Sequence, residues 1–490
     1  MISTAFVTLL SASLLGQTAD PAAEESMSES TITTEVVVEE GPADDEPAEG
    51  SLAALLGIPD EDGLTNYFTP WKELRAALEE NGLTLSVGMT STFQFHSGGL
   101  NQNGTFADFW SFDVTLSLDF GKLLKIEALE GIGATIYMDQ GYGDGANRNI
   151  GSIMGVNWDG TTSYGPYVAE YFLYIDKEVL PDLTVIGRLG KLCIHGGPFD
   201  RNEYAKDETS QFMASHFRIN PFIEGGEVGV YLIGAEIGLE YSLKNVAPGL
   251  PITAFFIHSG VYAQNGRDTT FGLKEAFTTV NGDKPDVIWL SEFGFRTELP
   301  SWTGEGVMPG TYRFGFGYNS DEVEQYAYNN WGGILPAKFE KGYNFFYMSF
   351  DQMVFKENSD EDDTQGLGLF FRYGTTPESK ALAPFWNVPI ESFWSFGFQY
   401  QGLIPTRDQD VLGFGYALMD LNGYAQPRSS GGFAASSAPR FKDEQILEIY
   451  YKIQVFNWLS VTPDLQYVLN PGGQGTDDAV VAGVRIQVAF

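Results

Sequence analysis

The segment AVVAGVRIQVAF, residues 479–490, decides the fold of this chain. Apolar side chains at every second position from Val480 to Phe490 fall on one face of an extended strand, whereas Arg485 and Gln487 fall on the other. Such a strand needs an apolar environment on one side and water on the other. A closed barrel in a membrane supplies both, with lipid outside and a wet lumen inside, and it leaves no sheet edge unpaired.

Earlier segments repeat this period of two. From Trp110 to Phe120, large apolar residues alternate with serine, aspartate and threonine, and segments 311–318 and 394–401 place aromatic residues on the apolar face. One strand contains Pro463, which lacks the N–H that a ladder needs, so we expect a bulge there. The pattern predicts sixteen strands, which begin near residues 83, 107, 127, 166, 183, 226, 251, 286, 309, 342, 365, 392, 410, 443, 459 and 479.

The predicted connections fall into two classes. Those after even-numbered strands have about 2 to 10 residues, whereas those after odd-numbered strands reach about 32. Brief turns at one end and long loops at the other are typical of a transmembrane barrel, and a soluble sandwich gives no reason for them. The expected fold class is therefore all-β, a transmembrane antiparallel barrel of about sixteen strands over residues 63–490. The stretch WKELRAALEEN, residues 71–81, predicts a short amphipathic helix before it.

Two segments precede the predicted barrel. Residues 1–19 contain an apolar run from Ala5 to Leu15 followed by small residues, which predicts a signal peptide. Residues 20–62 contain 14 acidic side chains and no basic ones. This composition is typical of a disordered segment.

Composition argues against several functional classes. A net charge of -37 disfavours nucleic-acid binding, which needs clustered Lys and Arg, and a mean hydropathy of -0.13 disfavours a bundle of membrane-spanning helices. The four histidines lie far apart, without metal-ligand spacing. His258 beside Ser259 is a neighbour in sequence and does not by itself indicate a hydrolase. We therefore expect no cofactor, no bound metal and no enzyme activity.

Several stretches resemble the carbohydrate-selective porin OprB family. They are LTVIGRLGK (183–191), FDRNEYAKDETSQFM (199–213), YQGLIPTRDQDVLGFGYA (400–417), EQILEIYYKIQ (444–454) and NWLSVTPDLQYVLNPGG (457–473), in the same order as in the family. The resemblance implies a sixteen-stranded barrel in the bacterial outer membrane that lets sugars and other small hydrophilic solutes diffuse down a gradient. Sugars and outer-membrane lipids would be its partners, and a homo-oligomer is left open. The terminal Phe490 also resembles the signal by which outer-membrane proteins are handed to their assembly machinery.

The candidate channel residues come from the longest connection and from the polar faces of strands. A barrel of sixteen strands is too wide for its own side chains to fill, so a loop has to narrow it. We expect the connection 194–225 to fold into the lumen against the wall that carries Arg188. Sugars need planar hydrogen-bonding groups and aromatic faces. The candidates that line the channel or contact the solute are Arg188, Asp200, Arg201, Glu203, Arg313, Arg372, Glu448, Lys452, Asp464, Gln466 and Arg485.

Two alternatives remain open from sequence. Each candidate residue can belong to a solvated wall without contacting a solute. The whole chain can also be a secreted or surface β-protein that binds glycans without transporting them. Fractionation separates the two functions, because a pore is recovered with the outer membrane as a heat-modifiable band and a secreted protein partitions into the aqueous phase.

Overall fold

The structure is a computed structural model that describes the chain from residue 71 to residue 489 with gaps. The predicted signal peptide, the acidic segment and Phe490 lie outside the described residues, and so do His195 and the acidic run 359–363. The described residues all belong to one unit, Leu52–Phe490. They are residues 71, 73–101, 105–143, 146–157, 164–194, 197–223, 231–263, 286–301, 306–325, 338–358, 364–376, 390–421 and 442–489.

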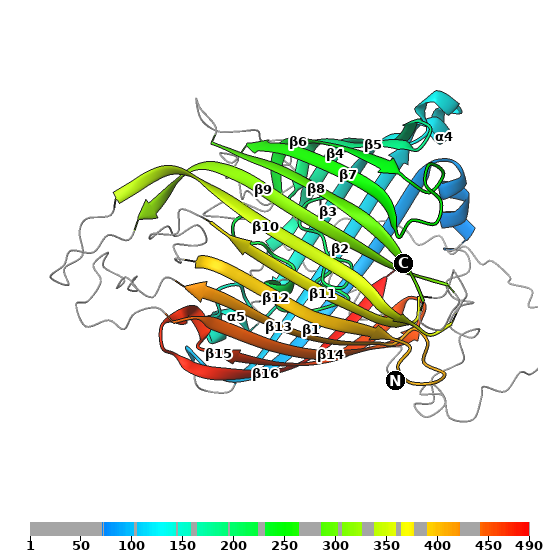
Figure 1. The fold of residues 1–490 in the computed structure, drawn as a ribbon. Helices are drawn as coiled ribbons and strands as arrows, with labels where there is room; N and C mark the ends of the chain where they lie inside the picture. The colour runs from blue at the N-terminus through cyan, green and yellow to red at the C-terminus, as the bar shows by residue number, and fades with distance from the viewer. Residues whose placement is uncertain are drawn as a thin grey trace, which may run out of the picture. The chain divides into compact units, whose positions relative to one another are not determined.

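Sixteen strands within the described residues form a closed antiparallel barrel (Figure 1). Each strand pairs with its neighbours in sequence, and β1 closes the barrel by pairing with β16. The predicted fold class is confirmed, and the predicted strand starts lie within about five residues of the observed ones. The strands are β1 Leu83–Gly99, β2 Thr105–Asp119, β3 Ile132–Gly143, β4 Tyr164–Leu180, β5 Leu183–Cys193, β6 Tyr231–Ser242, β7 Ile252–Ala263, β8 Val287–Pro300, β9 Val307–Gln325, β10 Lys338–Lys356, β11 Gly366–Thr375, β12 Ile390–Gln401, β13 Val411–Leu421, β14 Glu444–Phe456, β15 Leu459–Leu469 and β16 Asp477–Ala489.

The last strand shows how the sequence pattern sets the two faces of the wall. Arg485 of β16 lies opposite Thr92 of β1 and Thr462 of β15, and its side chain is buried inside the barrel. Val480 and Val484 on the other face of β16 are exposed outside. Large apolar side chains are exposed on the outer faces of most other strands as well, for example Phe255, Phe293, Trp394 and Phe396. The outer surface is thus suited to lipid and the inner one to water.

Pro463 does not form a bulge, so that prediction was wrong. Its register with β16 is unshifted, because Thr462, Pro463 and Asp464 pair in turn with Arg485, Val484 and Gly483. Toward β14 the register is also unchanged across Pro463, from Tyr450↔Asp464 to Ile453↔Val461, but the ladder skips the positions between them. The strand therefore accommodates the missing N–H of proline by an interrupted ladder and not by an extra residue.

Short helices mark the two ends of the barrel. Figure 1 shows α4 (Phe120–Leu124), which follows β2, at the end opposite to α5 (Asn147–Ile150), which follows β3. The predicted helix before the barrel is confirmed over residues 73–80, and it turns into β1 at Gly82 with φ +80°. A Cβ at Gly82 would lie 2.8 Å from Asp119 O, so this turn requires glycine. The 3-10 helices are η1 Glu127–Leu129, η2 Ser215–Phe217 and η3 Pro471–Gly473.

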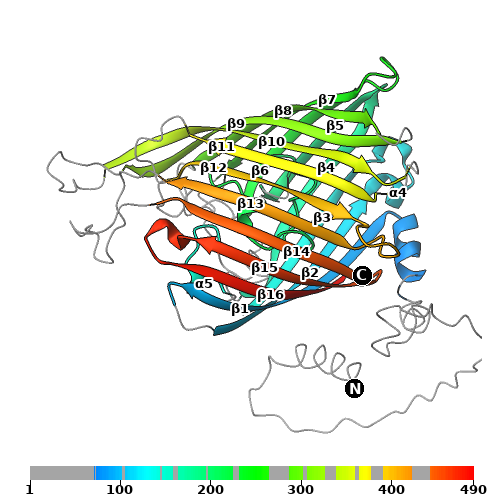
Figure 2. The same cartoon turned by 60° about the horizontal axis from the view of Figure 1, so that its bottom comes forward.

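The connections separate by length in most places, but 120–131 after β2 is longer than 100–104 after β1 and 470–476 after β15. Short ones such as 181–182 and 457–458 follow even-numbered strands, whereas the longest, 194–230, follows β5. The strands are strongly tilted around the barrel (Figure 2). Among the described residues, no helix is long and apolar enough to cross a membrane.

Candidate functional site

Residues 197–223, here called the lumenal loop, enter the barrel and are fastened to its inner wall. The guanidinium of Arg372 on β11 donates from Nη2 to Asp200 Oδ2 and from Nη1 to Phe217 O, both at 2.6 Å. Asp200 also accepts a bond from Asn220 Nδ2 at 2.8 Å, and its backbone N–H donates to Glu292 of β8 at 2.8 Å. These contacts with strands on the inside of a closed sheet confirm that the longest connection folds into the lumen.

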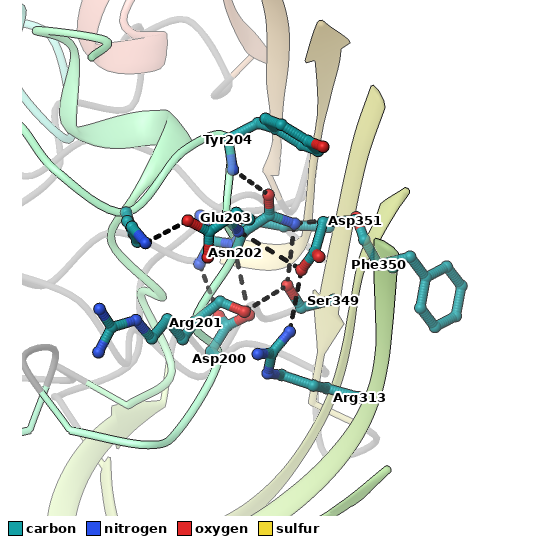
Figure 3. Close-up of polar contacts among 12 residues, drawn as sticks. Asp200, Arg201, Asn202, Glu203, Tyr204, Arg313, Ser349, Phe350 and Asp351 are labelled. Atoms are coloured by element: carbon teal, nitrogen blue, oxygen red, sulfur yellow. Dashed lines mark hydrogen bonds and ion pairs between the residues drawn. The ribbon is translucent and has the colours of Figure 1, made fainter. Parts of the chain in front are cut away.

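A second anchor joins the loop to β10 (Figure 3). Asn202 Nδ2 donates to Ser349 Oγ at 3.3 Å, and the backbone N–H of Glu203 donates to Asp351 Oδ2 at 3.4 Å. Asp351 is in turn paired with Arg313 of β9, with Nη1 and Oδ2 at 3.0 Å. Polar side chains from two neighbouring strands therefore hold the beginning of the loop.

A third anchor lies on β14 and β16. Glu448 accepts the backbone N–H groups of Met213 at 2.6 Å and of Ala214 at 3.0 Å. Arg485 donates to two loop carbonyl oxygens, at 2.8 and 2.9 Å. Both wall side chains are almost completely buried. Because the guanidinium of Arg485 is charged and shielded from water, its two bonds are stronger than ordinary neutral hydrogen bonds.

An aromatic cluster supports the same part of the loop. Phe212 and Phe217 of the loop lie 4.4 Å apart by ring centroid, and Phe212 contacts Phe370 of β11 and Tyr450 of β14 edge-on. Gly415 of β13 makes room for this cluster, because a Cβ there would lie 2.5 Å from the ring of Phe217. The loop therefore has its own small core against the wall, and it is held by packing as well as by polar bonds.

A second connection, which the sequence analysis did not anticipate, also enters the lumen. Glu444 of β14 accepts bonds from Ser152 Oγ at 2.9 Å, His216 Nε2 at 2.7 Å and the backbone N–H of Gly472 at 2.6 Å. Val156 O accepts bonds from glutamine side chains of β1 and β15. One buried carboxylate thus ties together residues from three separate connections.

The three anchors of the lumenal loop come from β8, β10, β11, β14 and β16, and the opposite side of the barrel carries partly exposed polar side chains. We call the inward faces of β2, β3 and β4 the open wall. On it, Tyr137 donates its hydroxyl to Asp113 at 2.5 Å and Tyr167 to Asp139 at 3.3 Å. The open wall carries Asp113, Thr115, Ser117, Thr135, Tyr137, Asp139, Tyr167 and Glu170.

The lumenal loop presents charged groups near the open wall. Asp113 interacts electrostatically with Asp139 beside it and with Glu208 and Asp207 of the loop. Burial raises the pKa of Asp207, but hydrogen bonds from Ser210 and Thr209 and the positive charge of Arg485 outweigh burial and lower this pKa below its ordinary value. Glu208 forms an ion pair with Arg218 at 2.5 Å. A solute between loop and wall would therefore meet carboxylates from both sides.

The structure places the predicted candidates in different settings. Arg188 is partly exposed, forms two bonds with Glu236 at 2.7 and 2.9 Å and lies 3.9 Å from Glu170. Arg201 and Glu203 are exposed on the loop, Asp200 is buried within it, and Lys452 is partly exposed on β14. The remaining candidates point inward and are buried, namely Arg313, Arg372, Glu448, Asp464, Gln466 and Arg485. Contact of any of these residues with a solute stays a prediction.

The open wall was missed by the sequence reasoning, although its signal was present. Asp113 alternates with apolar residues in the same segment that established the period of two. Tyr137 and Asp139 follow the same alternation on β3, where Asp139 lies directly opposite Asp113. Among the described residues, no group of three or more His, Cys, Asp or Glu side chains could hold a metal ion.

Comparisons with known proteins all indicate the same family of porins. The sequence matches the carbohydrate-selective porin, OprB family, over residues 104–490. Porin B of Pseudomonas aeruginosa is 27% identical over 257 residues, which are 48% of this chain and 52% of that protein. The putative porin QuiX of Acinetobacter baylyi is 25% identical over 211 residues, 41% of this chain and 44% of the relative. The matches thus span about half the length of these curated relatives.

The fold has a close counterpart among solved structures. The high-pH structure of Pseudomonas putida OprB superposes with a TM-score of 0.67 at 20% identity, and the match covers 86% of this chain and 97% of that one. At this identity the likeness concerns the fold alone. These comparisons give no support to a secreted glycan-binding protein.

Proposed function

The chain belongs to the carbohydrate-selective porin OprB family, and from this premise we propose that it is a passive channel for sugars and other small hydrophilic solutes. Its location is the bacterial outer membrane, and its fold is that of a channel. The long connections then lie outside the cell and the short turns in the periplasm, as in barrels of this class.

The position of the lumenal loop is the observation that carries the proposal. A sixteen-stranded barrel leaves an aqueous channel unless something fills it. Here the loop occupies one side of the lumen, bound to Glu292, Asp351, Arg372, Glu448 and Arg485. Solutes would pass between the loop and the open wall, where they meet hydroxyl and carboxylate groups. These groups can replace the water that a sugar loses in a narrow passage.

Arg188 lies beside this passage and is the strongest candidate for direct contact with sugars. Its guanidinium is held by Glu236 and lies 5.2 Å from the ring centre of Phe172. Loop residue Gly197 approaches it closely, since a Cβ there would lie 2.6 Å from Arg188 Nη2. A guanidinium fixed in this way presents its remaining N–H donors in a constant direction. The exposed Arg201 and Glu203 extend the polar surface along the loop.

The outer surface suits the partners expected of such a channel. Exposed apolar side chains such as Phe255 and Phe396 would contact outer-membrane lipids. Insertion would use the outer-membrane assembly machinery. Copies of the barrel could meet through the same surface, and the mass of the detergent-solubilised protein would report a homo-oligomer.

The function is tested with purified protein in liposomes and planar bilayers. Proteoliposomes should swell in isotonic glucose, and single channels should be partly blocked by added sugar. Deleting residues 203–210, between Asn202 and Gln211, should raise conductance and weaken the sugar block, because an obstruction with its hydrogen-bonding groups is removed. Arg188→Ala should weaken the block with a smaller change in conductance, because it removes donors but little volume.

Liposomes that do not swell in glucose would contradict the channel function itself. Pores whose conductance and sugar block are unchanged by the deletion would show instead that the narrowest part lies elsewhere.

A further inference from the structure

The charges of the lumen are unevenly distributed around the barrel. Among the described residues, the inward faces of β1 to β4 carry no lysine or arginine, while they carry Asp113, Asp139 and Glu170. The inward arginines come from the other strands, namely β5, β8, β9, β11 and β16. The open wall is therefore acidic. The electrostatic potential in the passage also depends on the charged groups on the rest of the lumenal surface.

Most of the inward arginines are neutralised where they stand. Four of them form ion pairs with a carboxylate at a nitrogen to oxygen distance of 3.0 Å or less. The pairs are Arg188–Glu236, Arg296–Glu240, Arg313–Asp351 and Arg372–Asp200. An ion pair acts at a distance as a dipole, so its field falls off faster than that of a single charge. These arginines consequently offset little of the charge on the open wall.

Asp113 and Asp139 of the open wall are held in a different way, whereas Glu170 lies 3.9 Å from Arg188. Asp113 and Asp139 accept bonds from the hydroxyls of Tyr137 and Tyr167, which are neutral donors. A neutral donor orients a carboxylate and places no positive charge beside it. The chief electrostatic neighbours of Asp113 are Asp139, Glu208 and Asp207, and all of them are acidic. Of the two loop acids, Glu208 has Arg218 as a partner, and Asp207 accepts bonds from Thr209 and Ser210 and interacts with the positive charge of Arg485.

We propose that this acidic passage admits neutral and cationic sugars, such as amino sugars, in preference to acidic sugars, and that Asp113 and Asp139 determine this specificity. The inference rests on the proposed channel function and adds the class of solute to it. A carboxylate or phosphate on the solute is repelled at the open wall, whereas an ammonium group is attracted, as at the charged rings of other pores. Each wall charge is worth roughly threefold in relative flux at a separation of about 7 Å in water.

Arg201 is one of the positive charges in the lumen outside those four ion pairs, together with Lys452 on β14 and Arg485 on β16. Its side chain is exposed on the loop, and Figure 3 shows its guanidinium pointing away from the cluster formed by Asp351 and Arg313. It can therefore attract anions where the paired arginines cannot. Removing this charge and removing the wall charges should have opposite effects on selectivity.

The experiment compares selectivity and flux in the full-length protein. Reversal potentials are measured in planar bilayers under a KCl gradient, and swelling rates are measured for glucose, glucosamine and glucuronate. The wild type should be cation-selective and should pass glucosamine faster than glucuronate. Asp113→Asn with Asp139→Asn should move the reversal potential toward the anion side and raise the glucuronate to glucose ratio several-fold. Asparagine still accepts the tyrosine hydrogen bonds, and a heat-modifiable band checks that the variant is folded.

Three matched variants control the result. Glu80→Gln removes the same charge from the exposed helix before β1 and should change neither readout. Arg201→Gln should shift the reversal potential further toward the cation side, and Asp113→Glu should retain the selectivity of the wild type. The inference would be overturned if the wild type were anion-selective, or if the double variant kept the reversal potential and the glucuronate to glucose ratio of the wild type. Glucose flux in the same experiment would still support the channel function. Absence of glucose flux in the wild type would instead defeat the proposed function.

Discussion

Asp200 of the lumenal loop and Arg372 of β11 form a buried ion pair, with Oδ2 and Nη2 at 2.6 Å. The same guanidinium donates to Phe217 O, and the same carboxylate accepts a bond from Asn220. One pair of charged side chains therefore joins the two arms of the loop to a single position on the wall. Removing either partner would leave the other as a buried polar group without its ion-pair partner.

Replacing Arg372 by Met should release the loop. Asp200 would be left as a buried charge without its partner, at a cost of about 3 to 5 kcal/mol. The barrel is closed, with every strand paired on both sides, so we expect the loop to leave the wall before the barrel unfolds. Larger and noisier single-channel conductance should result, with faster protease cleavage within residues 199–220.

The control for this variant is Arg407→Met, which breaks the partly exposed pair with Asp410 at the short-turn end. It should leave the conductance steady. The double variant Arg372→Met with Asp200→Asn should recover part of the lost protection, because no buried charge remains. Conductance of Arg372→Met that matches the wild type would refute the anchoring role.

Glu448→Gln should loosen the middle of the loop. Glu448 accepts N–H groups from Met213 and Ala214 with its two carboxylate oxygens. An amide offers one oxygen, and its NH2 group would face a second donor, so we expect a loss of about 1 to 3 kcal/mol. Hydrogen exchange at the amides of Met213 and Ala214 measures this directly. Unchanged protection of both amides would contradict the prediction.

Gly415→Ala should disturb the aromatic cluster from the opposite side. The added methyl would lie 2.5 Å from the ring of Phe217, which is fully buried against Phe212. Overpacking of this kind typically costs about 1 to 3 kcal/mol. We expect faster proteolysis of the loop, partly corrected by Phe217→Leu in the same protein. Gly165→Ala serves as control, because nothing lies within 4 Å of its added Cβ.

Features that depend on a local sequence pattern could be predicted, whereas features that depend on contacts between distant parts of the chain could not. The period of two placed Arg372, Glu448 and Arg485 on the inward face correctly, because strand parity is local. That loop residues cover them could not be predicted, since the covering groups come from distant parts of the chain, as Phe217 does for Arg372. The effect of Pro463 could not be predicted for the same reason. Whether proline causes a bulge or only interrupts the hydrogen-bond ladder depends on the pairing with β14 and β16.

The joining of several connections by one residue was equally hidden from sequence. Glu444 reads as one more polar position near the start of a strand. Its importance depends on Ser152, His216 and Gly472 reaching the same point. No sequence spacing predicts that these three residues contact one carboxylate, whereas the alternation that places Asp113 on the inward face is visible within about ten residues of the sequence.

The hydrogen bonds of Asp207 should make the loop depend on pH in a defined direction. Burial raises the pKa of this carboxyl, but the bonds from Ser210 and Thr209 and the charge of Arg485 bring it below the ordinary value of 3.8. A lowered folded-state pKa means that the ionised group stabilises the folded loop at all pH values above 3.8. That stabilisation is lost only as the pH falls through the lower, folded-state pKa.

Asp207→Asn tests this dependence by hydrogen exchange of residues 205–213, corrected for intrinsic rates. The variant should be less protected than the wild type by a constant amount above about pH 5, and the difference should shrink only below 3.8. Glu203→Gln is the control on the same loop, because Glu203 is exposed and pairs only with the neighbouring Lys206 among the described ion pairs. It should leave protection unchanged at every pH. A difference for Asp207→Asn that grows as the pH falls from about 6 to about 5 would mean that the folded-state pKa is raised and not lowered.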